Sequence, residues 1–88
     1  MSEIVAKVHC RRGNHALVQL EGRKYPGLLL QGDSLKQIEV VVDELVELRR
    51  EDQGDEFDIA LHEIVEVVKG LTGSYESMMK EKKLELPY

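Results

Sequence analysis

Gln31-Gly32-Asp33-Ser34-Leu35 divides the sequence into two parts with different hydrophobic periods. Before this stretch apolar residues alternate with polar ones, which is the pattern of β-strands with one buried face. After it they recur every three or four residues, as in amphipathic α-helices. Asp33 or Ser34 can cap a helix, because a side-chain oxygen there accepts hydrogen bonds from free N–H groups of the first turn. The sequence therefore predicts an α+β fold.

Three short strands are predicted before residue 31. They cover residues 4–11, 16–21 and 28–31, and they are joined by turns rich in Gly, Asn and Pro. Short connections favour an antiparallel sheet. Leu28-Leu29-Leu30 is apolar at every position, so we expect the third strand to be central in the sheet or covered by a helix.

Two amphipathic helices are predicted after residue 33. The apolar stripe of the first comprises Leu35, Ile38, Val41 or Val42, Leu45 and Leu48. A second helix, with a broader stripe, begins near Asp55. Gly70 and Gly73 disfavour helix by up to about 1 kcal/mol each, which leaves open whether this helix is continuous or breaks into a third. We expect one domain, residues 1–88, with a three-stranded antiparallel sheet followed by two or three helices packed on one face.

Composition indicates a folded protein of the cytoplasm. Of the 88 residues, 42% are hydrophobic and 33% charged, an ordinary globular balance. The single Cys10 cannot form an internal disulfide, and residues 1–4 lack the start of a signal peptide. No apolar run approaches the roughly 18 residues of a membrane span. A stability of about 4–13 kcal/mol leaves little margin, so apolar surface needs a core or a partner, and a homodimer is one solution.

Ser34 is the residue that most suggests catalysis. Gly32-Asp33-Ser34-Leu35 has the letters of the GDSL hydrolase motif, but a serine nucleophile needs a base within hydrogen-bond reach and an oxyanion hole. Only His62 follows it, within a helical pattern. We favour a capping role for Ser34 and predict no catalytic residues, while a minimal GDSL-type hydrolase is the remote alternative.

Metal and cofactor sites are not predicted. His9 and Cys10 are neighbours on a strand and are expected to point to opposite faces. His62-Glu63 lacks a second histidine four residues later, because residue 66 is Glu. Cys10, in register with Val8, is interpreted as a core thiol.

Charge is distributed unevenly along the chain. The formal charge is −5, but residues 38–68 alone carry −9, from eleven acidic residues and two arginines. Such a segment either keeps the protein soluble or attracts a partner with a positive surface. The predicted partner-binding residues are Glu39, Asp43, Glu44, Glu47, Glu51 and Asp52.

Four basic residues occupy the first two predicted turns. Arg11, Arg12, Arg23 and Lys24 would form one cluster only if both turns lay at the same end of the sheet, whereas consecutive hairpin turns lie at opposite ends. Aromatic residues are not interleaved with them, and the chain as a whole is acidic. Nucleic acid is therefore not the expected partner.

The turn and capping motifs also carry a family resemblance. The pattern Gly13-Asn14-x-Ala16-x-Val18-x-Leu20-x-Gly22-Arg23-x-x-Pro26-Gly27, continued by residues 31–35 and the closing Leu86-Pro87-Tyr88, resembles a family of small uncharacterised bacterial proteins. That family has no assigned activity, so the resemblance implies kinship and transfers no functional residue. In size and acidity the chain is also similar to bacterial immunity proteins, which bind and block a cognate toxin.

These observations favour a non-catalytic binding protein. The leading hypothesis is an immunity- or antitoxin-type inhibitor whose acidic helix face covers the positively charged cleft of an enzyme or toxin. The alternative is a structural or regulatory homo-oligomer, in which the broad stripe of the second helix packs against its copy.

Overall fold

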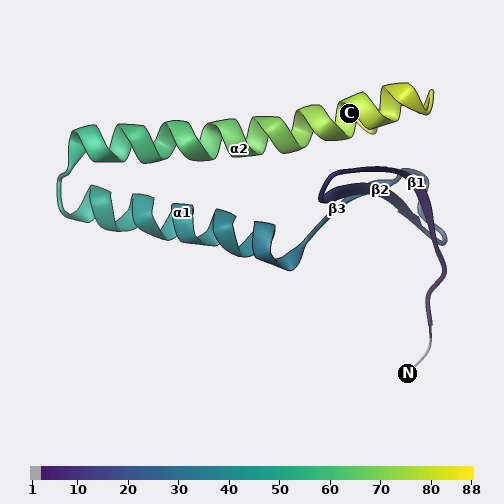
Figure 1. The fold of residues 1–88 in the computed structure, drawn as a ribbon, viewed down its shortest axis with the longest axis horizontal. Helices are drawn as coiled ribbons and strands as arrows, with labels where there is room; N and C mark the ends of the chain where they lie inside the picture. The colour runs from purple at the N-terminus through teal and green to yellow at the C-terminus, as the bar shows by residue number, and fades with distance from the viewer. Residues whose placement is uncertain (1–2) are drawn as a thin grey trace. The chain divides into compact units, whose positions relative to one another are not determined.

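A computed structural model describes residues 3–88. It shows a three-stranded antiparallel sheet followed by two helices (Figure 1). This confirms the predicted α+β class and element order. The elements are β1 (Ala6–Arg12), β2 (His15–Leu20), β3 (Gly27–Leu30), α1 (Gly32–Arg50) and α2 (Gly54–Glu81).

The strands form a meander with β2 in the centre. Val8 pairs with Val18 and Cys10 with Leu17, so the register shifts at His9. Gly13 has a φ of 59°, a left-handed conformation that a glycine adopts without strain in a tight hairpin turn. The third strand was expected to be central in the sheet or covered by a helix, and this is wrong for the face of β3 that carries Leu29. β3 is an edge strand, and Leu29 is 53% exposed.

The chain divides into two compact units, which we describe separately. The sheet unit contains the strands together with residues 72–88, and the hairpin unit is Gly32–Leu71. Helix α2 contributes its first part to the hairpin unit and its last part to the sheet unit.

The core of the sheet unit lies between the sheet and the end of α2. Leu17, Met78 and Met79 are fully buried, and Tyr75 is nearly so. Cys10, Leu28, Leu84 and Leu86 pack around them. The inward position of Cys10 is thereby confirmed, and Leu84 and Leu86 bring the C-terminal tail onto the same core.

The hairpin unit consists of α1 and the antiparallel first part of α2 (Figure 1). Its buried side chains among residues 32–71 are Val41, Leu48 and Ala60. The link between the helices is a Schellman motif, in which Gln53 N–H donates to Leu48 C=O at 3.0 Å and Asp52 takes a φ of 57°. The expectation that Leu35 belongs to the packed stripe is wrong, because this side chain is 60% exposed.

Helix α2 is continuous through Gly70 and Gly73, so the third helix that these glycines left open is not seen. The border between the two units, after Leu71, falls between them. Neither glycine is required by packing, because an added Cβ would meet nothing within 4 Å at either position.

We therefore expect alanine at Gly70 and Gly73 to stabilise the protein, by up to about 1 kcal/mol each, because alanine loses less backbone entropy in a helix. Thermal unfolding followed by circular dichroism measures the change. Gly13→Ala is the matched control and should destabilise, because its φ of 59° strains any side chain. A lower melting temperature for Gly70→Ala would contradict the expectation.

Neither helix of the described chain has a stretch that is both long and apolar enough to cross a bilayer.

Candidate functional site

Ser34 lies in the first turn of α1, where its backbone N–H donates to Asp33 Oδ1 at 2.9 Å. The helix begins at Gly32, before both predicted caps, so Asp33 lies within the first turn, where its carboxylate also faces the positive end of the helix dipole. His62 is an exposed residue of α2. Within residues 3–88 no hydrogen bond joins the Ser34 side chain to a histidine, so the base that a serine nucleophile needs is not beside it.

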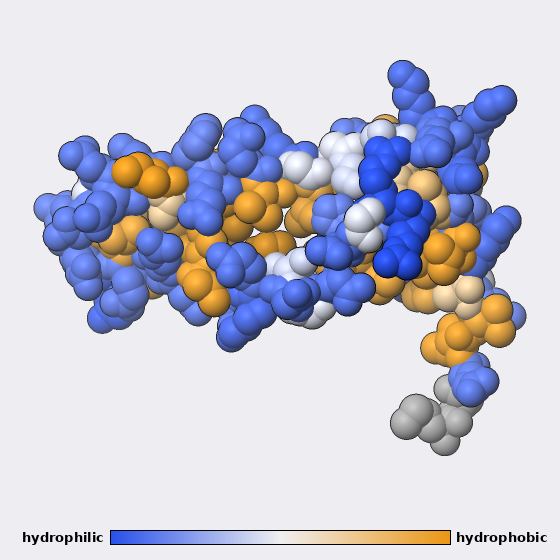
Figure 2. Space-filling model, viewed as in Figure 1, coloured by the Kyte–Doolittle hydropathy of each residue, from blue (hydrophilic) through white to orange (hydrophobic). Residues whose placement is uncertain are grey.

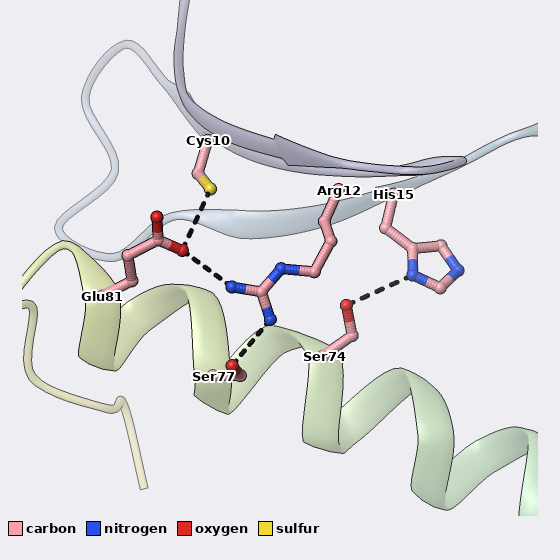
Figure 3. A network of polar contacts seen from close by, with 6 residues as sticks. All are labelled: Cys10, Arg12, His15, Ser74, Ser77 and Glu81. Atoms are coloured by element: carbon pink, nitrogen blue, oxygen red, sulfur yellow. Dashed lines mark hydrogen bonds and ion pairs between the residues drawn. The ribbon is translucent and has the colours of Figure 1, made fainter.

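Another serine, Ser74, lies beside a histidine in the sheet unit. His15 Nδ1 lies 3.3 Å from Ser74 Oγ, between β2 and α2 (Figure 3). A nucleophile of this type also needs a group that orients the imidazole and an oxyanion hole. No carboxylate is hydrogen-bonded to His15 in the described part of the chain. The contact therefore fastens α2 to the sheet.

Beside it, Arg12 makes the central contact of a polar network (Figure 3). Its Nη1 donates to Ser77 Oγ at 2.6 Å, and its Nη2 donates to Glu81 Oε2 at 2.7 Å. The thiol of Cys10 lies 3.8 Å from the same carboxylate oxygen. About half of both charged side chains is exposed, so the ion pair adds at most about 1 kcal/mol. Its role is to fix the register of α2 on β1.

Sequence reasoning missed this network. Ser74, Ser77 and Glu81 are spaced three and four apart, which places them on one side of α2, and that spacing was the available signal. The condition for a single basic cluster at the first two turns is not met. Arg12 adjoins the β1–β2 turn, whereas Arg23 adjoins the turn at the opposite end of β2.

Residues 3–88 bring together no three His, Cys, Asp or Glu side chains that could hold a metal ion. His9 Nε2 instead lies 2.7 Å from Gln19 Oε1, whose amide donates to the carbonyls of Arg23 and Lys24. The clefts of the surface are shallow. One of about 180 Å³ lies at the helix link beside Phe57, and one of about 440 Å³ lies beside Lys7 and Arg23.

All six predicted partner-binding residues are exposed on the hairpin unit. Asp43 and Glu47 are four residues apart on α1, so their carboxylates are separated by about 6 Å along the helix axis. Glu39 is paired with Lys36, and Glu47 Oε1 accepts from Arg50 Nη1 at 3.2 Å. The remaining members are Glu44 on α1 and, in the link, Glu51 and Asp52.

The two units carry opposite net charges. The hairpin unit has twelve acidic and four basic residues, a formal charge of −8, and the rest of the chain has +3. The charge segregation of the sequence thus coincides with the division of the structure.

Comparison with protein families identifies the chain. The model of a family of unknown function, DUF6959, matches residues 1–88. The chain belongs to DUF6959. No curated protein and no solved structure gives a significant match. Membership of DUF6959 agrees with the resemblance to an uncharacterised family and assigns no activity to any residue described above.

Proposed function

We propose that this DUF6959 protein is a non-catalytic binding protein that captures a partner with a basic surface through the acidic side of α1. The observation that carries the proposal is the concentration of charge in one structural unit, the −8 hairpin unit, on which Asp43, Glu44 and Glu47 are exposed. Fields of this kind steer association and penalise partners of the wrong sign.

The contacts that these acids make within the chain are weak enough to be exchanged. The Arg50–Glu47 and Lys36–Glu39 pairs are each well over half exposed, and such i,i+3 pairs contribute only a few tenths of a kcal/mol. A lysine or arginine of a partner can therefore take over Glu47 at little cost to the helix.

The specific version of the proposal is an immunity- or antitoxin-type inhibitor. A helix whose carboxylates are spaced about 6 Å apart along its axis presents a line of negative charge, as the phosphate backbone of a nucleic acid does. The fitting partner is an enzyme or toxin whose positively charged cleft binds phosphates. In this proposal the protein acts in the cytoplasm, a compartment in which a free thiol such as that of Cys10 stays reduced.

The test reverses the charge of the α1 surface. The partner is first recovered from a lysate of the native host on the tagged protein at low salt, and its association rate is then measured from 50 to 500 mM salt. Asp43→Lys with Glu47→Lys is expected to slow association at least about tenfold at low salt and to flatten the salt dependence.

The matched control is Glu21→Lys with Glu85→Lys, which makes the same change in net charge with exposed residues of the sheet unit. It should slow association much less, because the field of the α1 surface is intact. Equal effects of the two double variants, or no effect of the first, would refute the acidic binding surface.

A further inference from the structure

Helix α2 has buried side chains at two places only, one in each unit. In the hairpin unit its buried residue is Ala60, and in the sheet unit its buried residues are Tyr75, Met78 and Met79. No residue from 61 to 74 is buried. At about 1.5 Å per residue, roughly 20 Å of the helix thus lacks a buried side chain. On the side of the molecule shown in Figure 2, hydrophilic side chains predominate along α1 and the neighbouring part of α2.

This weakly packed stretch contains Gly70 and Gly73. An added Cβ would meet nothing within 4 Å at either position, so neither glycine serves a close approach. What each glycine adds is backbone freedom, which makes the helical conformation about fivefold less favourable than it is for alanine. Ser74 follows Gly73 directly, and Gly/Ser pairs are among the few causes of sharp kinks in helices. Residues 70–73 are therefore the part of α2 that opens most easily.

The border between the two units coincides with this stretch. The chain crosses the border twice, after Gln31 and after Leu71. At the first crossing Gln31 and Gly32 are exposed, and a Cβ on Gly32 would also meet nothing within 4 Å. Hinges are a few residues at the ends of elements or in loops that absorb changes in φ and ψ. Both crossings satisfy that description, because no packed group opposes a change of backbone angles there.

The sheet unit holds its end of α2 through contacts that begin directly after Gly73. The first is the contact of Ser74 with His15, and the next is the buried hydrogen bond from Tyr75 to Pro26. The polar network of Figure 3 continues them along the helix. The docked end of α2 is therefore expected to stay on the sheet when the helix opens before it.

We propose that α2 is hinged at residues 70–73, where its backbone hydrogen bonds open reversibly and allow the hairpin unit to reorient relative to the sheet unit. Low local stability follows from few buried side chains and from backbone hydrogen bonds exposed to solvent, and this stretch has both. Gly70, Thr72 and Gly73 are exposed, so water replaces the opened bonds at once.

The hinge gives the acidic surface freedom to move. Asp43, Glu44 and Glu47 all belong to the hairpin unit, so reorientation turns these carboxylates while the sheet unit keeps its fold. The hinge does not rest on the proposed function, because its test uses the chain without a partner.

Hydrogen exchange of the full chain, followed amide by amide by NMR, tests the opening. The amides of residues 71–76 close hydrogen bonds that span the hinge. Relative to their intrinsic rates, they should exchange at least about tenfold faster than the amides of residues 60–64 and 78–81, which lie beside the buried side chains of α2. Equal protection along the whole helix in the wild type would overturn the proposal.

Gly70→Ala with Gly73→Ala should remove this difference, by slowing exchange at residues 71–76 about twentyfold. Gly54→Ala is the matched control, because Gly54 begins α2 and an added Cβ there also meets nothing within 4 Å. It should leave the difference between residues 71–76 and their flanks unchanged. A difference that survives in the double variant would show that the glycines are not the hinge.

Residual dipolar couplings in a weakly aligned sample test the reorientation. In the wild type, couplings of residues 55–68 and 75–81 should require alignment tensors of different magnitude, and in the double alanine variant one tensor should fit both. A single tensor for the wild type would mean that the two parts of α2 move as one rigid helix, which would refute the hinge. The double alanine variant keeps all six acidic residues, so loss of partner capture by charge reversal is a separate result.

Discussion

Leu17→Ala is expected to destabilise the protein by about 2–5 kcal/mol, the largest effect of any single change to the sheet unit. Leu17 is fully buried in the central strand and packs in one cluster with Tyr75, Met78 and Met79. Removing its side chain loses the transfer free energy of the deleted atoms and leaves a cavity that a paired central strand cannot collapse to fill. Urea denaturation at neutral pH measures the loss.

Leu20→Ala is the matched control, since Leu20 lies on the same strand but is 49% exposed. We expect Leu20→Ala to lower the free energy of unfolding by less than about 1 kcal/mol, because a half-exposed side chain removes little apolar surface from water. For a domain whose whole stability is on the order of 4–13 kcal/mol, the Leu17 variant loses a large share of it, and at the lower end of that range it is partly unfolded even without urea. Equal losses for the two variants would show that the core is not centred on Leu17.

The composition allows the two units to be followed separately in this experiment. The chain has no tryptophan, and its three tyrosines, Tyr25, Tyr75 and Tyr88, all belong to the sheet unit. Tyrosine fluorescence therefore reports that unit alone, while helical circular dichroism is dominated by α1 and α2. Because α2 continues from one unit into the other, we expect both signals to change together in the wild type.

The order of elements followed from the sequence because it depends on local periodicity. The alternation before Gln31 and the period of three to four after it are properties of neighbouring residues, and both led to the observed strands and helices. The position of Leu29 did not follow. Strand order decides whether an apolar strand is central, and strand order depends on pairing between distant segments.

The same distinction applies to the candidate surfaces. Exposure of Asp43 and Glu47 could be predicted, since unpaired carboxylates are rarely buried. The Arg12–Glu81 contact joins residues 69 positions apart and had no local signal beyond the spacing on α2. Leu35 was assigned to the packed stripe of the first helix although it is exposed, because periodicity gives the width of an apolar stripe and not what covers it.

Tyr75→Phe is expected to destabilise the protein by about 1–3 kcal/mol although it removes a single oxygen atom. Tyr75 Oη donates a buried hydrogen bond of 2.6 Å to the carbonyl of Pro26, which joins α2 to the start of β3. Without the hydroxyl that carbonyl is left desolvated and unpaired, which costs more than the net value of an ordinary hydrogen bond. Tyr25→Phe, the same chemical change at a half-buried tyrosine of the sheet unit, should have a smaller effect in urea denaturation.

The hydroxyl of Tyr75 also predicts how stability changes in alkali. Burial raises the pKa of Tyr75 above its ordinary value of 10.0, because the phenolate is poorly solvated there. The folded state therefore binds this proton more tightly than the unfolded state, so the contribution of Tyr75 is fully present below pH 10 and is lost as the pH rises through the raised pKa. The stability difference between wild type and Tyr75→Phe should accordingly be constant from pH 7 to 9 and shrink above pH 10. A stability difference that stays constant up to pH 11 would mean that the phenol of Tyr75 titrates alike in the folded and unfolded states. The hydrogen bond from Tyr75 to Pro26 would then not be what joins α2 to the start of β3.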